Sequence, residues 1–254
     1  MEIIVRSKRV CDIPLLELYE NNGVKKKPMV LLYHGYLGRK EFVLIQAYNL
    51  ACNGFFVVVP DAYGHGERGS GQVIDLFDSI QHSTSEIDNL IDSYTDNQDA
   101  DNTRVGLAGF SMGGCITFQY IAQEKKKVKA AVPIISTPDW VSIVDNFNTP
   151  EKTEELKSLG IIKEAGELAE YRKIAESIQP INRYEMMKDT PLLMLCGAKD
   201  MVTPVSGAQR LYELLRPIVA DEDALKLVID PNSAHADTVG MNLMLAEWMK
   251  KYLA

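Results

Sequence analysis

The chain has 254 residues, of which 46% are hydrophobic and 24% charged, and a formal net charge of −8. This composition is typical of a soluble globular protein and excludes a disordered or fibrous one, and the length suits one domain over residues 1–254. The basic runs Lys25–Lys27 and Lys125–Lys127 are too short to form a nucleic-acid surface, so no nucleic-acid partner is expected.

The chain shows no signal for export, membrane insertion or disulfide formation. No apolar run approaches the roughly 20 residues that span a bilayer, and no basic segment followed by an apolar core opens the sequence. The four cysteines, Cys11, Cys52, Cys115 and Cys196, are far apart and form no C-x-x-C pair. We therefore expect a cytoplasmic protein with no membrane partner, no disulfide and no zinc site.

The apolar runs predict a largely parallel α/β sheet. Two β-rich stretches at the start, Ile3–Val10 and Ile13–Tyr19, predict an antiparallel hairpin. Short apolar runs then alternate with helical patterns, as in a doubly wound sheet covered on both faces. The expected strands are Met29–Tyr33, Phe55–Val59, Val105–Ala108, Ala130–Ile135, Leu192–Leu195 and Leu225–Ile229, and the expected helices cover residues 40–52, 76–96, 112–124, 204–216 and 237–252.

One segment, residues 138–189, interrupts this alternation. It has no strand pattern and contains helical stretches rich in Glu and Lys, at 152–158 and 164–178. We expect a helical insertion here, which is either a plain crossover with extra helices or a small cap that shapes a substrate pocket. Because the sites of such sheets gather at the carboxyl ends of the strands, we expect the reactive residues at those ends.

A serine lies at one of these strand ends. Gly109-Phe110-Ser111-Met112-Gly113 is a G-x-S-x-G sequence between an expected strand and an expected helix. A serine on such a sharp turn exposes its hydroxyl at the strand end, and the flanking glycines let strand and helix approach closely. Ser111 could otherwise be only a helix N-cap, but its setting favours a nucleophile.

A serine hydroxyl needs a base to take its proton, and histidine suits that task near neutral pH. Of the four histidines, only His235 follows the last expected strand, the place where such a base is expected. The carboxylate that orients the base should follow a strand between serine and histidine, and Asp200 after Leu192–Leu195 fits. Asp139, one strand earlier, is the alternative acid, although it also reads as a helix N-cap.

The oxyanion of a tetrahedral intermediate needs two preorganised donors. One is expected to be the backbone N–H of Met112, directly after the serine, and the second that of Tyr36 in the loop after the strand ending at Tyr33. His34 and Gly35 in the same loop are expected to shape the turn rather than to react.

A glycine-rich loop, Gly64–Gly69, formally matches G-x-G-x-x-G. A dinucleotide-binding loop would open a helix at once and be followed by an acidic residue at the end of a second strand. Here Glu86 and Asp88 lie in a helical pattern, so we expect no cofactor. His65 or Arg68 could tether this loop or contact substrate, and we favour tethering.

In this order, His34-Gly35, Gly109–Gly113, Gly197-Ala198-Lys199-Asp200 and His235 resemble the motifs of the α/β-hydrolase superfamily. More narrowly, Pro60–Arg68 and the G-F-S-M-G-G turn resemble bacterial esterases near the dienelactone-hydrolase and prolyl-oligopeptidase branch. The resemblance implies the α/β-hydrolase fold and ester or thioester hydrolysis without a cofactor. Two departures exist: dienelactone hydrolases use cysteine where Ser111 stands, and Ala234-His235 replaces a frequent Gly-His pair.

The sequence thus predicts a serine hydrolase that cleaves a small-molecule ester through an acyl-enzyme, with Ser111, His235 and Asp200 as catalytic residues and no metal. The alternatives are a thioesterase or peptidase with the same triad, and a hydrolase-fold protein that only binds a ligand. The Glu- and Lys-rich helices of 138–189 lack the broad apolar face of a lipase lid, so acyl chains of roughly two to six carbons are expected. Nothing in the sequence specifies the oligomeric state.

Overall fold

The computed structural model describes residues 1–72 and 74–254. Within these residues eight strands form one sheet in the order β1-β2-β4-β3-β5-β6-β7-β8. Strand β2 is antiparallel to both of its neighbours, β1 and β4. All other neighbouring strands in the sheet are parallel to each other. The strands are β1 Ile3–Val10, β2 Ile13–Glu20, β3 Lys27–Tyr33, β4 Phe56–Pro60, β5 Ala100–Phe110, β6 Ala130–Ile134, β7 Leu192–Gly197 and β8 Leu225–Asp230.

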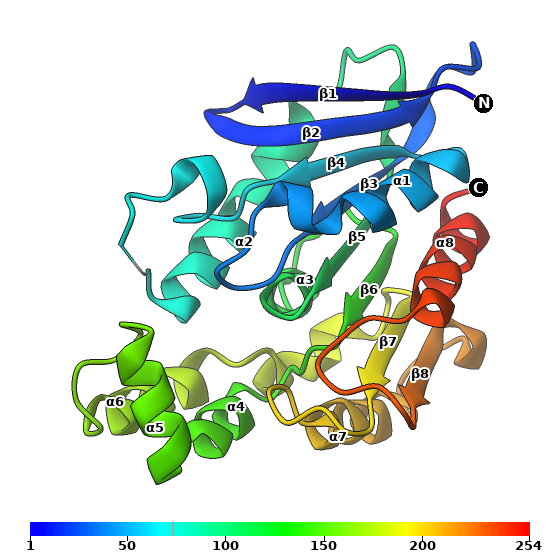
Figure 1. Cartoon of the computed structure of the whole chain (residues 1–254). Helices are drawn as coiled ribbons and strands as arrows, with labels where there is room; N and C mark the ends of the chain where they lie inside the picture. Colours follow the sequence, from blue (N-terminus) through cyan, green and yellow to red (C-terminus); the bar gives the residue numbers. More distant parts are fainter. Residues whose placement is uncertain (73) are drawn as a thin grey trace.

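Helices cover both faces of the sheet, as the continuous apolar strands predicted (Figure 1). Helices α1 and α8 pack on one face, and α2, α3 and α7 pack on the other. The α-helices are α1 Leu44–Cys52, α2 Leu76–Asp92, α3 Met112–Ile121, α4 Trp140–Phe147, α5 Pro150–Ser158, α6 Glu167–Ile178, α7 Val205–Leu215 and α8 Val239–Leu253. Single turns or short runs of 3₁₀ helix occur at Lys40–Val43, Gly66–Arg68, Pro180–Met187 and Glu222–Ala224.

The segment 138–189 folds as three α-helices, α4 to α6, followed by the 3₁₀ helix. These helices lie together beyond the carboxyl ends of the strands, below β6 in Figure 1. Trp140 of α4 is fully buried and its ring stacks on that of Phe77 in α2 at 5.5 Å. The segment is therefore packed on the main body of the protein by its apolar side chains, while its Glu and Lys side chains face solvent.

The sheet and its two-face covering confirm the predicted α/β-hydrolase fold. The clearest differences from the expected boundaries lie at two places. Strand β5 begins at Ala100, because Ala100 and Asp101 pair with Lys27 and Pro28 of β3 before a register shift, after which pairing resumes at Val105. The helix expected over 76–96 ends at Asp92, where a series of turns begins. None of the helices in the described residues has the length and apolar character to cross a bilayer.

Candidate active site

Ser111 lies on a sharp turn between β5 and α3. Its backbone has φ 53° and ψ −113°, a combination that costs a non-glycine residue of order 1–3 kcal/mol. The surrounding contacts enforce this turn: a Cβ on Gly109 would lie 2.4 Å from the backbone of Gly113, and one on Gly113 would lie 2.4 Å from the carbonyl oxygen of Tyr33. The glycines thus let α3 begin directly against β5 and β3, which leaves the Ser111 hydroxyl at the sheet edge.

His235 and Asp200 reach the same edge from β8 and β7. Their loops are joined by the backbone bond from Lys199 N–H to Ser233 O, at 3.0 Å. The Nδ1 atom of His235 lies 2.8 Å from Asp200 Oδ2, and its Nε2 atom lies 2.9 Å from Ser111 Oγ. With the Nδ1 proton donated to the carboxylate, Nε2 is free to accept the proton of the serine hydroxyl.

The Asp200 carboxylate is almost fully buried and densely hydrogen-bonded. Its Oδ1 atom accepts from the backbone N–H groups of Val202 at 2.8 Å and Thr203 at 2.9 Å, and the Thr203 hydroxyl lies 2.9 Å from Oδ2. Burial alone would raise the pKa of Asp200, but the hydrogen bonds from His235 and from these N–H groups outweigh it and hold the pKa below its usual value. The group is an anion at neutral pH.

Asp139, the alternative acid, has a different environment. It is the N-cap of α4, where its Oδ1 atom accepts from Ser142 N–H at 3.2 Å, and its Oδ2 atom lies 3.6 Å from the Arg210 guanidinium. Within the described residues, His235 Nδ1 forms its hydrogen bond with Asp200 and not with Asp139. The geometry therefore favours Asp200 as the partner of the base.

The loop after β3 brings Tyr36 next to Ser111. A Cβ on Gly35 would lie 3.5 Å from the Cβ of Ser111, so the two turns are in close contact. Among the backbone hydrogen bonds that lie outside regular helices and strands, none in the described residues has the N–H of Tyr36 or of Met112 as its donor. Within the described part of the chain, neither N–H group is thus taken by such a partner.

His34 fixes this loop and takes no part in the hydrogen bonds that join Asp200, His235 and Ser111. Its Nδ1 atom donates to Gly35 O at 2.8 Å, and its Nε2 atom accepts from Ala62 N–H at 3.1 Å. Burial lowers the pKa of His34 to about 4, so the ring is neutral at pH 7. The prediction that His34 shapes the turn is confirmed.

The glycine-rich loop Gly64–Gly69 is tethered through Glu67 and Arg68. Arg68 forms a bidentate pair with Glu86 of α2, at 2.8 and 2.6 Å. Asp61, which directly follows β4, accepts from Glu67 N–H and from both the backbone N–H and the Nζ atom of Lys40. The predicted tethering role of Arg68 is confirmed. The buried Lys40–Asp61 pair was not predicted, since two residues 21 positions apart give no local pattern.

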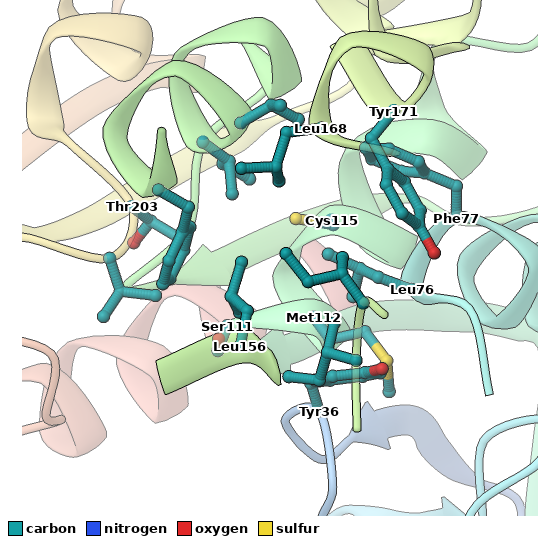
Figure 2. A pocket seen from close by; sticks show the side chains of 16 residues that line it. Tyr36, Leu76, Phe77, Ser111, Met112, Cys115, Leu156, Leu168, Tyr171 and Thr203 are labelled. Atoms are coloured by element: carbon teal, nitrogen blue, oxygen red, sulfur yellow. The ribbon is translucent and has the colours of Figure 1, made fainter. Parts of the chain in front are cut away.

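A cavity of about 150 Å³ adjoins Ser111; we call it the inner pocket (Figure 2). In Figure 2, Phe77 and Tyr171 face it at one end and Thr203 at the other, with Met112 and Cys115 between them. The helical segment supplies about half of its wall. The residues of that segment that line it are Ile143, Val144, Phe147, Leu156, Ile161, Ile162, Leu168 and Tyr171.

The family model described as "Prolyl oligopeptidase family" matches residues 41–254. The chain belongs to the prolyl oligopeptidase family. It is a serine hydrolase with the α/β-hydrolase fold, and Tyr36 lies in the part of the chain that precedes the matched residues.

Relatives of this family member cover most or nearly all of its length. "Putative esterase YitV" of Bacillus subtilis is 29% identical over 99% of this chain and 100% of its own. "Esterase YjfP" of Escherichia coli is 26% identical over 84% of this chain and 85% of its own. Among solved structures, TT1662 from Thermus thermophilus has a TM-score of 0.76 at 19% identity, over 100% of this chain and 99% of that one. The esterase Pf2001 of Pyrococcus furiosus has a TM-score of 0.69 at 17% identity, over 100% and 94%.

Proposed function

We propose that this hydrolase cleaves small carboxylic esters through an acyl-enzyme, with Ser111 as nucleophile, His235 as general base and acid, and Asp200 as the orienting carboxylate. The observation that carries the proposal is the unbroken relay from Asp200 to His235 and from His235 to Ser111, with heavy-atom distances of 2.8 and 2.9 Å. The esterase names of the relatives YitV and YjfP support an ester rather than a peptide as substrate.

In the first step, Ser111 Oγ attacks the ester carbonyl carbon while its proton passes to His235 Nε2. The carbonyl oxygen becomes an oxyanion, and the Asp200 carboxylate stabilises the imidazolium. The C–O bond to the alcohol then breaks as His235 returns the proton to the leaving oxygen. Water, deprotonated by the same Nε2 atom, attacks the acyl-enzyme and releases the acid and free Ser111.

The oxyanion would be held by the N–H groups of Tyr36 and Met112. Both lie beside Ser111 without another partner among the described residues, and the N-terminus of α3 adds a favourable dipole for negative charge. This assignment needs no cofactor and no metal, because the two N–H groups supply the electrophilic help that a Lewis acid gives elsewhere.

We further propose that residues 1–254 form one domain in which 138–189 is a small cap. Its helices wall the inner pocket and bury their apolar side chains against it. A cap packed in this way limits the acyl group, and we expect chains of roughly two to six carbons to be preferred.

The test is Ser111→Ala, measured with p-nitrophenyl esters from acetate to palmitate. The kcat should fall by roughly 10³-fold or more with the fold intact, because the nucleophile is lost. Ser85→Ala, at an exposed serine of α2, is the matched control. Retained esterase activity in a clean Ser111→Ala preparation would refute the mechanism, and a maximum at long chains with a jump at the solubility limit would refute the cap assignment.

A further inference from the structure

Two hollows of different shape meet at Ser111. The inner pocket leads toward α2 and the helical segment, and most of its lining side chains are buried. A second hollow of about 490 Å³ leads away between the loop after β3, helix α1 and the loop before α8; we call it the outer groove. Ser111, Tyr36 and Val202 border both hollows, so an ester bound at the serine can extend into each of them.

We propose that the inner pocket binds the acyl group of the ester and the outer groove binds its alcohol, so that selection is strict for the acyl group and permissive for the alcohol. The proposal rests on the function proposed above. Its substrates are esters of a compact, uncharged acid with a larger, apolar alcohol.

The position of His235 determines which half of the ester goes where. In the step that breaks the C–O bond, His235 Nε2 must give a proton to the leaving oxygen, so the alcohol has to lie on the His235 side of the serine. His235, Ala236 and Asp237 all line the outer groove, whereas none of them is among the residues that line the inner pocket. The alcohol therefore leaves through the groove, and the acyl group occupies the pocket.

The inner pocket suits a small neutral acyl group. An apolar cavity of about 150 Å³ holds a ring of the size of benzene, which corresponds to about six carbons. The described residues of its wall include no charged side chain. An acyl group with a free carboxylate, as in the half-ester of a diacid, would therefore lose the hydration of that carboxylate without gaining a cationic partner. The rings of Phe77 and Tyr171, with centroids 6.1 Å apart, provide aromatic faces at its far end. We therefore expect hexanoyl to lie near the upper size limit of this pocket.

The outer groove has an apolar rim open to solvent. Phe42, Val43 and Ile135 are among the apolar residues that line the groove, and Phe42 is 66% exposed. A hydrogen bond of 2.8 Å from Gln46 Nε2 to Asp237 Oδ2 joins α1 to the loop before α8, which holds the two sides of the groove together. Such a rim can cover an apolar alcohol without limiting its length.

The experiment is a two-way series of esters, with acyl groups from acetyl to decanoyl on one alcohol and alcohols from methanol to decanol or naphthol on butyrate. We expect kcat/KM to fall by about tenfold or more between hexanoyl and decanoyl, but not along the alcohol series. Leu156→Ala should raise the ratio of decanoate to butyrate turnover, because Leu156 lines the inner pocket. This ratio does not depend on the fraction of folded enzyme.

Phe42→Ala is the matched variant of the groove. It should lower kcat/KM for naphthyl butyrate by about three- to tenfold relative to methyl butyrate and leave the acyl preference unchanged. Deacylation gives a second readout, because the alcohol has departed by then: single-turnover decay of the acyl-enzyme should change in Leu156→Ala and not in Phe42→Ala. A length limit in the alcohol series, or a deacylation defect in Phe42→Ala, would overturn the assignment. Hydrolysis that persists in Ser111→Ala would instead overturn the proposed function.

Discussion

Substitution of Asp200 by Asn should reverse the tautomer of the base. The Oδ1 position accepts two backbone N–H groups, from Val202 and Thr203, so an amide NH₂ cannot occupy it. The asparagine must place its oxygen there and its NH₂ toward His235 Nδ1, at the 2.8 Å position of the present Oδ2. His235 then accepts at Nδ1 and carries its proton on Nε2, where it can no longer accept the serine proton.

The expected loss in kcat is about 10⁴-fold, equivalent to about 5.5 kcal/mol of activation free energy. Asp139→Asn is the matched control: asparagine caps α4 as well as aspartate does, and only the pairing with the largely exposed Arg210 is lost. Its kcat should change by less than about twofold. The assay is p-nitrophenyl butyrate hydrolysis near neutral pH, with thermal unfolding as a check on the fold. Equal losses in the two variants, or a larger loss in Asp139→Asn, would refute the reasoning.

Three further outcomes are expected. Burial lowers the pKa of His34 to about 4, from about 6.5 in the unfolded state, so between these pH values the unfolded state binds a proton that the folded state does not. Urea denaturation should therefore show a free energy of unfolding that falls by about 3 kcal/mol between pH 6.5 and 4. The fall should be smaller in His34→Gln. Gly113→Ala should lower stability and activity together, since its Cβ would meet Tyr33 O at 2.4 Å. Gly240→Ala in α8 should do neither, because its Cβ would make only an ordinary contact with Thr238 Oγ1 at 3.7 Å. Activity should survive exhaustive EDTA treatment, and a stoichiometric metal whose removal abolishes turnover would show that the mechanism is incomplete.

Local patterns were sufficient to predict the sheet and the strand ends. Continuous apolar runs such as Leu192–Leu195 mark strands buried on both faces, and parallel strands bring their carboxyl ends to one edge. Ser111, Asp200 and His235 each follow such a strand, so their approach could be foreseen from chain order alone. Strand β5 was predicted too short, because residues 101–104 are polar and the pairing of Ala100 and Asp101 with β3 depends on tertiary context.

Contacts between distant residues were not predictable in the same way. The inner pocket depends on Phe77 of α2 meeting Tyr171 of α6, and the groove on Gln46 meeting Asp237. Each of these residues has an ordinary place in its own helix or loop, and only the packing of the elements brings the partners together. Trp140, Ile143 and Val144 are the buried residues of α4, but helical spacing alone does not indicate which part of the protein such residues cover.

The most direct test of the central claim, that Ser111 is the activated nucleophile, is covalent labelling with a fluorophosphonate followed by intact-protein and peptide mass spectrometry. An activated serine reacts quickly with such a probe, whereas an ordinary serine hydroxyl does not. We predict one adduct per chain, located on the peptide that contains Ser111, with labelling abolished in Ser111→Ala and strongly slowed in Asp200→Asn. A protein that stays unlabelled while folded, or an adduct at another residue that persists in Ser111→Ala, would contradict the account.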